Sequence, residues 1–161
     1  MLRIAKTLLV CSVVLWGLVG AFHNILDWSG TLGAVGAATS MATFEGGAES
    51  WQATSSMVIV WAGALFICLS KLLTAGLCGV GATRMWAARG AGAAEFEAAK
   101  SFALTGCAVA VLMLFGGFIV IAESWFEMWR SDVMRGPVLQ SAFRYGGMIA
   151  LIALFVATRD D

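Results

Sequence analysis

The sequence feature that most constrains the fold is an apolar stretch from Met57 to Ala82 with one charged residue, Lys71, close to its middle. About 20 apolar residues, each rising about 1.5 Å, span the roughly 30 Å hydrocarbon core of a bilayer. The stretch therefore predicts a transmembrane helix. A lysine so deep in lipid costs about 2.5–3.5 kcal/mol on insertion scales, and its stem is too short to reach either interface. We expect Lys71 to face other helices.

Small and large side chains of this stretch fall on opposite faces when it is wound at about 100° per residue. The face predicted to pack inside the protein comprises Ala64, Cys68, Lys71, Thr74, Ala75, Cys78 and Ala82. The face predicted to meet lipid comprises Leu65, Phe66, Leu69, Leu72, Leu73, Leu77 and Val80. This division favours a packed membrane helix, because small side chains allow neighbouring helices to approach closely.

The composition is typical of an integral membrane protein, because 60% of the residues are hydrophobic and only 12% are charged. The length of 161 residues allows one small domain without a separate soluble catalytic module. A formal net charge of zero gives no basic surface for nucleic acid. The four cysteines lie in apolar stretches without a CxxC pair, and His23 is the only histidine. We expect buried free thiols, no metal site and no cofactor such as a bis-histidine haem.

Three further apolar stretches complete a predicted all-α fold, a four-helix transmembrane bundle in a single domain over residues 1–161. We expect the helices at about residues 5–27, 57–83, 101–125 and 140–158. The first apolar run, Leu8–Ile25, follows Arg3 and Lys6 and could instead be a signal peptide cleaved after Ala21. Because the run is longer than the usual h-region of about 7–15 residues, we predict a retained helix.

The segments between the predicted spans differ in length and composition. Ser29–Ser56 is rich in small residues and predicts a longer outer loop between the first two helices. Within it, Thr31–Met41 is apolar but too short to span, so it is either an interfacial or re-entrant segment or a plain loop. Arg84–Lys100 predicts a short polar turn, and the glycine-proline pair of Arg130–Leu139 predicts a turn that breaks any helix.

Lysines and arginines are unevenly shared between the two sides of these four spans. Six fall on the side of both termini: Arg3, Lys6, Arg84, Arg89, Lys100 and Arg159. Three fall on the other side: Arg130, Arg135 and Arg144. Because cytoplasmic segments carry the excess of positive charge, we expect both termini to be cytoplasmic.

Polar side chains gather near the predicted outer ends of the helices. Six of them should lie at similar depth: His23, Asn24, Asp27, Glu123, Glu127 and Arg144. Arg144 lies about one turn inside the fourth helix and would be costly unpaired, so we expect an ion pair with Glu123. Such a cluster either locks the bundle or forms a ligand or proton site. Three tryptophans are predicted to anchor the same interface: Trp28, Trp125 and Trp129.

No acidic residue of the chain is predicted at the depth of Lys71. Its neighbours there should be residues near Trp16, Met113 and the middle of the fourth helix. Three environments are then open: a hydrated cavity, a lysine kept neutral by desolvation, or an acidic group from a partner subunit or a lipid. The first two are properties of this chain alone, whereas the third would make the protein a subunit.

Several short motifs carry a resemblance to a known family. They are Ala21-Phe22-His23-Asn24, Asp27-Trp28, Leu73-Thr74-Ala75, Arg84-Met85-Trp86, the tryptophan-rich segment Glu123–Trp129, and Ala142-Phe143-Arg144. Together they resemble a bacterial family of predicted small integral membrane proteins of unknown function. The segment Glu123–Trp129 is the most specific of these motifs. The resemblance implies four helices in a bacterial inner membrane and implies no activity.

The functional hypothesis is a non-catalytic accessory or structural subunit of a larger membrane complex, for example an energy-transducing one, in the bacterial inner membrane. Small size, no recognisable catalytic constellation and a buried lysine without its own counter-ion favour it. Expected partners are the lipid bilayer and other membrane subunits or further copies of the chain. The alternative is a small oligomeric transporter or channel for a proton or small anion that uses Lys71 and the outer polar cluster. A third class, an intramembrane enzyme or lipid-binding protein, would depend on Glu123 or Asp27.

Overall fold

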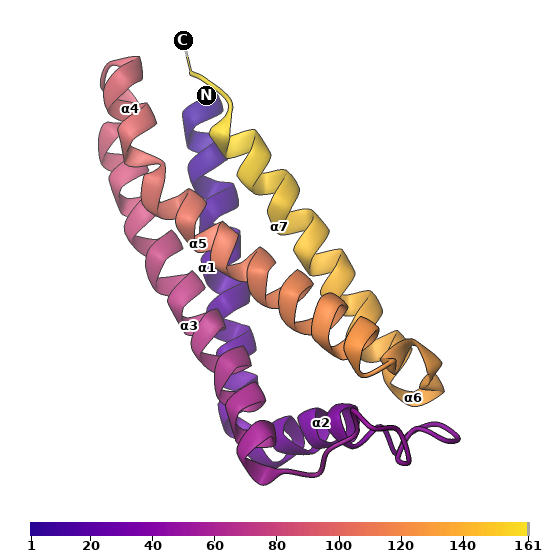
Figure 1. Cartoon of the computed structure of the whole chain (residues 1–161). Helices are drawn as coiled ribbons and strands as arrows, with labels where there is room; N and C mark the ends of the chain where they lie inside the picture. The colour runs from indigo at the N-terminus through magenta and orange to yellow at the C-terminus, as the bar shows by residue number, and fades with distance from the viewer. Residues whose placement is uncertain (161) are drawn as a thin grey trace.

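The fold is a bundle of long helices that lie close together at one end of the molecule and spread apart toward the other. The computed structural model describes residues 1–160 and contains only helices and their connections over that range. Four helical stretches are long and apolar enough to cross a membrane: Leu2–Leu26, Met57–Gly90, Ala93–Trp125 and Asp132–Ala157. The predicted all-α fold with four spans is therefore confirmed. Both termini lie at one end, the terminal end, and α2 (Trp28–Ser40) lies at the other, the α2 end (Figure 1).

The first two spans, α1 (Leu2–Leu26) and α3 (Met57–Ala87), run in opposite directions and make the most extensive helix contact of the molecule (Figure 1). Gly17 of α1 allows this approach, because a Cβ there would lie 2.8 Å from the backbone oxygen of Lys71. Membrane helices commonly pack through close backbone contact at glycine. Because the hydrophobic effect does not drive helices together in lipid, their association depends on van der Waals contact.

The two predicted faces of α3 are confirmed. Residues of the inner face are buried, except the half-buried Lys71: Ala64, Cys68, Thr74, Ala75, Cys78 and Ala82. Residues of the lipid face are exposed, except the half-buried Leu77: Leu65, Phe66, Leu69, Leu72, Leu73 and Val80. The spacing of small and large residues was therefore enough to orient this helix.

The third span begins earlier than expected. After α3 come η1 (Ala88–Gly90), α4 (Ala93–Ala99), α5 (Ser101–Val111) and the π-helix η2 (Leu112–Trp125). The turn expected over Arg84–Lys100 is therefore shorter than predicted, because α3 continues through the first residues of this range, α4 occupies its last ones, and the chain reverses between them, over residues 88–92. Alanine and glutamate, which make up most of α4, are strong helix formers. The glutamates of this segment therefore do not indicate a turn.

The fourth span also begins earlier than expected. It follows η3 (Met128–Arg130) and consists of α6 (Asp132–Met134), the π-helix η4 (Arg135–Gln140) and α7 (Ser141–Ala157). Pro137, predicted to break any helix, instead lies inside the wide π turn near the start of the span. Pro137 is the sixth residue of the span, and the π turn there replaces the regular α-helical hydrogen bonding that a proline would disrupt.

The segment between the first two spans holds α2, so the interpretation as a packed segment holds and the plain loop is wrong. Asp27 caps this helix, because its Oδ1 accepts a hydrogen bond from the Gly30 backbone N–H at 3.0 Å. Figure 1 shows α2 lying across the foot of α1 and α3 rather than parallel to them. Its side chains touch the second span, where Val35 would meet a Cβ placed on Gly63 at 2.8 Å.

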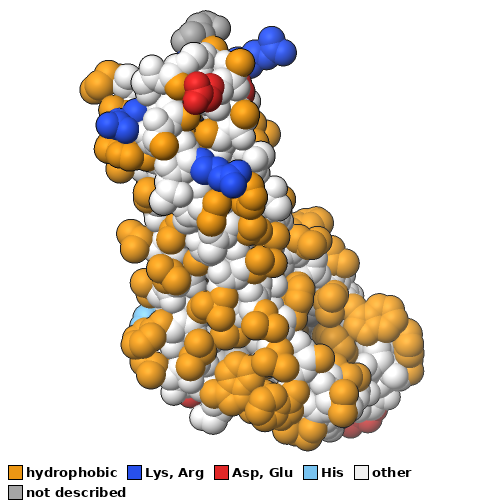
Figure 2. Space-filling model, turned by 90° about the vertical axis from the view of Figure 1, so that its left-hand side faces the viewer, with side chains coloured by type: hydrophobic (Ala, Val, Ile, Leu, Met, Phe, Trp, Pro, Cys, Tyr) orange, Lys and Arg blue, Asp and Glu red, His pale blue; other side chains and the backbone are white. Residues whose placement is uncertain are grey.

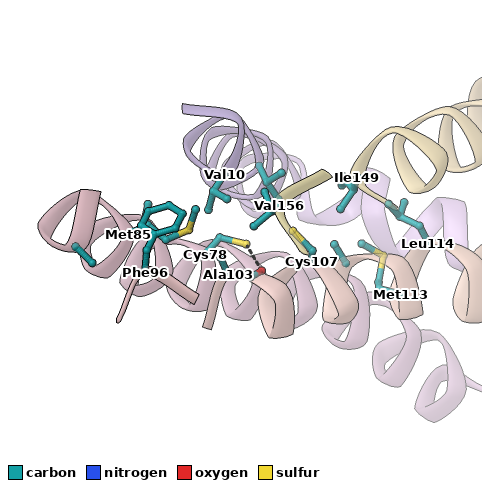
Figure 3. Close-up of a cluster of buried hydrophobic side chains, with 14 of the residues drawn as sticks. Val10, Cys78, Met85, Phe96, Ala103, Cys107, Met113, Leu114, Ile149 and Val156 are labelled. Carbon is teal, nitrogen blue, oxygen red and sulfur yellow. Dashed lines mark hydrogen bonds between the residues drawn. The ribbon is translucent and has the colours of Figure 1, made fainter. Parts of the chain in front are cut away.

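Hydrophobic side chains from all four spans form one core, which contains large residues such as Phe96 and Met113 as well as small ones (Figure 3). Its members from α3 and α5 include Cys78, Ala103 and Cys107, and the Cys78 thiol donates to the Ala103 carbonyl at 3.6 Å. Val10 and Val156 complete it from the first and last helices. Three of the four cysteines, Cys68, Cys78 and Cys107, are buried free thiols as predicted, whereas Cys11 is a half-buried free thiol.

Charge and hydropathy vary along the length of the bundle. Figure 2 shows the face that carries α3 and α4, with lysine and arginine side chains toward the terminal end and hydrophobic side chains over most of the remainder. This distribution suits a molecule whose middle lies in hydrocarbon and whose terminal end reaches water.

Candidate functional site

A cavity of about 890 Å³ opens where the helices diverge, and it is the main candidate for a functional site. Its walls come from the ends of α1 and α3, from η2 and η4, and from α2 beneath them. Most of the lining is apolar and includes Ile59, Phe66, Ile67, Phe118, Ile121 and Val138. The polar lining is confined to His23, Asn24, Asp27, Thr31, Thr39 and Lys71. An apolar cavity with a few convergent polar groups is typical of a ligand site.

Lys71 projects from α3 toward α1, so the prediction that it faces another helix is confirmed. Its Nζ donates to Asn24 Oδ1 at 2.8 Å and makes a longer contact of 3.5 Å with the Gly20 carbonyl. A Cβ on Gly20 would lie 3.2–3.3 Å from the end of the lysine side chain, so glycine makes room for it. None of the ion pairs formed among residues 1–160 involves Lys71.

The ammonium group lies closer to the α2 end than the sequence suggested. It was expected level with Trp16 and Met113, but its partners Gly20 and Asn24 lie about one to two helical turns further along α1. The reason is the direction of the side chain. Helical side chains lean toward the N-terminus of their own helix, and the N-terminus of α3 is at the α2 end.

The cavity is closed toward the terminal end. On α3 its lining runs from Ile59 to Lys71 and goes no further. Beyond this point the bundle is filled by core side chains such as Cys78, Cys107 and Met113, which are at most 1% exposed. The cavity is therefore a blind pocket whose polar end is Lys71.

The other polar residues predicted near the outer end serve mainly local structure. Asp27 caps α2, and its neighbour Trp28 packs on Trp61 with ring centroids 5.5 Å apart. Glu127 pairs with Arg130 at 2.8 Å. Of these contacts, only the Trp28–Trp61 pair joins two helices, α2 and α3, and the other two lie within their own segments.

The expected ion pair between Arg144 and Glu123 is wrong. Arg144 instead hydrogen-bonds within its own helix, to the Gln140 carbonyl and the Ser141 hydroxyl. On α7 the buried residues are Ala142, Ile149 and Val156, seven positions apart, which places Arg144 on the opposite face. No ion pair of Glu123 is formed within residues 1–160.

A comparison with known families fits this architecture. The family model described as "Predicted small integral membrane protein (DUF2165)" matches residues 2–159. The chain belongs to this family. No curated protein and no solved structure matches the chain. Membership confirms the resemblance seen in the short motifs and establishes an integral membrane protein, and the family description names no activity.

This family member carries a second polar cluster that the sequence analysis missed. At the terminal end, Asp160 binds Lys6 at 2.7 Å and Lys100 at 2.6 Å, and Lys100 also binds Glu97 at 2.6 Å. Both ammonium groups additionally donate to the Thr158 carbonyl. The cluster joins the start of α1, the α4–α5 junction and the segment after α7.

Lys6 and Lys100 had been counted only as charges that orient the chain in the membrane. Their residues are 0% and 1% exposed, so they are part of the packed interior. A signal was present, since Lys6 stands four and seven positions before the buried Val10 and Val13 and so shares their helix face.

The electrostatics of this cluster favour the ionised carboxylate. Burial alone would raise the pKa of Asp160, but the hydrogen bonds from Lys100 and Lys6 outweigh burial and hold this pKa below its usual range. The carboxylate thus stays charged between two buried cations.

Among residues 1–160, no three histidine, cysteine or acidic side chains are grouped so that they could hold a metal ion.

Proposed function

We propose that the protein is a non-catalytic accessory subunit of a larger complex in the bacterial inner membrane, for example an energy-transducing one. The observation that carries this proposal is an unpartnered small-residue face on α3. Gly76, Gly79 and Thr83 lie on one side of the helix, and a Cβ on either glycine would meet no atom of residues 1–160 within 4 Å. Small residues at the surface of a membrane helix let a second helix approach closely.

An apolar groove beside this face extends the contact surface. It measures about 450 Å³ and is lined by Leu18, Val19, Phe22 and Ile25 of α1 together with Leu72 of α3. Leu72 lies one turn from Gly76, so the groove and the glycine face form one continuous track along the outside of the α1–α3 pair. A transmembrane helix of another chain fits such a track, because van der Waals contact drives helix association in lipid.

The blind end of the cavity favours a subunit over the alternative of a transporter or channel. A translocation path through this chain would have to continue past Lys71, where the core residues described above pack closely. A transporter would then need a path between copies of the chain.

The test is native purification in mild detergent, with the migration of the protein compared between variants. We expect the wild-type chain to migrate with a partner, and Gly76→Leu or Gly79→Leu to release it as a monomer. The matched control is Gly147→Leu on α7, because a Cβ there also meets no described residue within 4 Å, and α7 contributes nothing to the track. A wild-type chain that purifies only as a monomer would contradict the proposal.

A further inference from the structure

The cavity at the α2 end contains a polar side chain that a bound molecule can contact. It contains a cation, Lys71, whose partners within residues 1–160 are an amide oxygen and a backbone oxygen, both neutral. A lysine in a membrane interior is normally neutralised by an acid, because an unpaired charge in an apolar environment is costly. The Asn24 contact and the longer Gly20 contact engage two of the three ammonium donors, and neither supplies a negative charge. The site is therefore suited to binding an anionic group.

The other charged groups of the lining leave this position free for an anion. The acid that faces the cavity is Asp27, and its Oδ1 is already engaged by the Gly30 backbone N–H and the Ser29 hydroxyl. The positive end of the α2 dipole offsets its charge. His23 also lines the cavity and is exposed, and its ring can donate a hydrogen bond to an anion.

The remainder of the cavity is suited to hydrocarbon. Apolar side chains from α3 and η2 cover it, and several of them are exposed as well as lining it, including Ile59, Phe66 and Ile121 at 43–52%. The cavity is thus open at its side, where α3 and η2 face the lipid. Its volume of about 890 Å³ lies within the range of about 300–1,000 Å³ typical of small-molecule sites.

We infer that this cavity binds an amphipathic acid from the bilayer, with its carboxylate or phosphate group on the Lys71 ammonium and its acyl chain along the apolar wall. The acyl chain itself contributes little selectivity, because lipid tails outside the cavity are equally apolar. Recognition therefore depends on the charged contact, which is shorter and stronger than a neutral hydrogen bond.

This dependence on charge gives a test that needs no variant. The purified wild-type chain in detergent is titrated with palmitate or with methyl palmitate, and bound ligand is counted by native mass spectrometry. We expect palmitate to bind at least about tenfold more tightly, because the ester offers the same chain without the negative charge. Equal binding of acid and ester would overturn the inference.

Variants locate the site. Lys71→Met should reduce palmitate affinity at least about tenfold, and Lys71→Gln, which keeps a donor for Asn24, should reduce it similarly if the methionine variant folds poorly. The matched control is Arg144→Met, which removes a cation of the α2 end that does not line the cavity. Palmitate affinity that is unchanged in both Lys71 variants would overturn the assignment.

Two sources of the acid can be separated in the same experiment. Phosphatidylglycerol is compared with phosphatidylcholine, again with Lys71→Gln as the variant. Charge-selective, Lys71-dependent binding of the phospholipid identifies a headgroup as the ligand, and such binding of palmitate alone identifies a free fatty acid; either result supports the inference. A carboxylate of a partner protein crosslinked or resolved on Lys71 in the native complex would overturn it.

Discussion

Lys71 and Lys100 carry the same charge but lie in different environments. Lys100 is 1% exposed and is fully compensated by Asp160, Glu97 and the Thr158 carbonyl. Lys71 is half-buried at a cavity wall, and its partners among the described residues are neutral. A compensated buried lysine avoids the cost of an unpaired buried charge, whereas an uncompensated one next to a cavity is better suited to binding.

At the residue scale, the first prediction concerns Asp160. Replacing it by asparagine leaves Lys6 and Lys100 buried without their shared carboxylate, and breaking a buried pair in this way costs about 3–5 kcal/mol. We expect Asp160→Asn to lower the free energy of unfolding by an amount of this order, measured by denaturation in micelles. Asp132→Asn is the control, because the Asp132–Arg135 pair is exposed and should contribute little.

A second prediction follows from the pKa of the same residue. Because the folded state holds the pKa of Asp160 below its value in the unfolded chain, about 3.9, the cluster contributes its full stability above that pH. This stability is lost as the pH falls below about 4 toward the folded pKa. Thermal unfolding midpoints measured across this range should fall for the wild-type chain and change less for Asp160→Asn. A parallel decline of the two proteins would contradict the assignment.

At the element scale, neighbouring glycines of α3 should respond oppositely to the same substitution. A Cβ on Gly81 would overlap the backbone of Ala103 in α5, whereas a Cβ on Gly79 meets open space. We expect Gly81→Ala to destabilise the bundle by about 1–3 kcal/mol through overpacking. Gly79→Ala should leave stability unchanged or slightly raise it, because alanine is the better helix former. Unfolding of the monomer in detergent, followed by circular dichroism, compares them.

The α2 helix gives another prediction at this scale. The Asp27 side chain caps its N-terminus, and removal of such a cap costs about 0.5–2 kcal/mol of helix stability. We expect Asp27→Ala to raise amide exchange within Trp28–Ser40 while exchange in α5 stays unchanged. Uniform exchange changes across the molecule would indicate a global role for Asp27 instead.

Sequence periodicity predicted the elements better than their ends. The spacing of small residues located the inner face of α3 correctly, because burial in a membrane helix follows the 3.6-residue repeat. Local polarity and the Gly136-Pro137 pair led us to predict the starts of the third and fourth spans too late. Polar side chains and proline are both tolerated near the start of a helix. The cavity was not predictable, because it depends on how far the helices diverge.

The same limit applies to the polar groups. The sequence indicated that Lys71 faces protein, but its contact with Asn24 depends on the direction of the side chain and on the exact pairing of α1 with α3. The ion pairs of Asp160 join positions up to 154 residues apart, and no local pattern specifies such a pair.

At the scale of the whole molecule, the two ends differ in construction. The terminal end is closed by buried ion pairs and a packed core, whereas the α2 end holds the cavity and most of the exposed tryptophans. If the cavity binds a ligand as inferred, binding takes place at one side of the membrane. Which side this is depends on the orientation of the chain.

The distribution of positive charge predicts that the open end faces away from the cytoplasm. The test uses a chain without its native cysteines, into which one cysteine is introduced at either end. We expect Glu49→Cys, in the exposed segment that follows α2, to react with a membrane-impermeant maleimide added to intact cells. Arg89→Cys, exposed at the terminal end, should react only after the membrane is opened. The reverse labelling pattern would place the cavity on the cytoplasmic side, where the amphipathic acid would have to come from the inner leaflet.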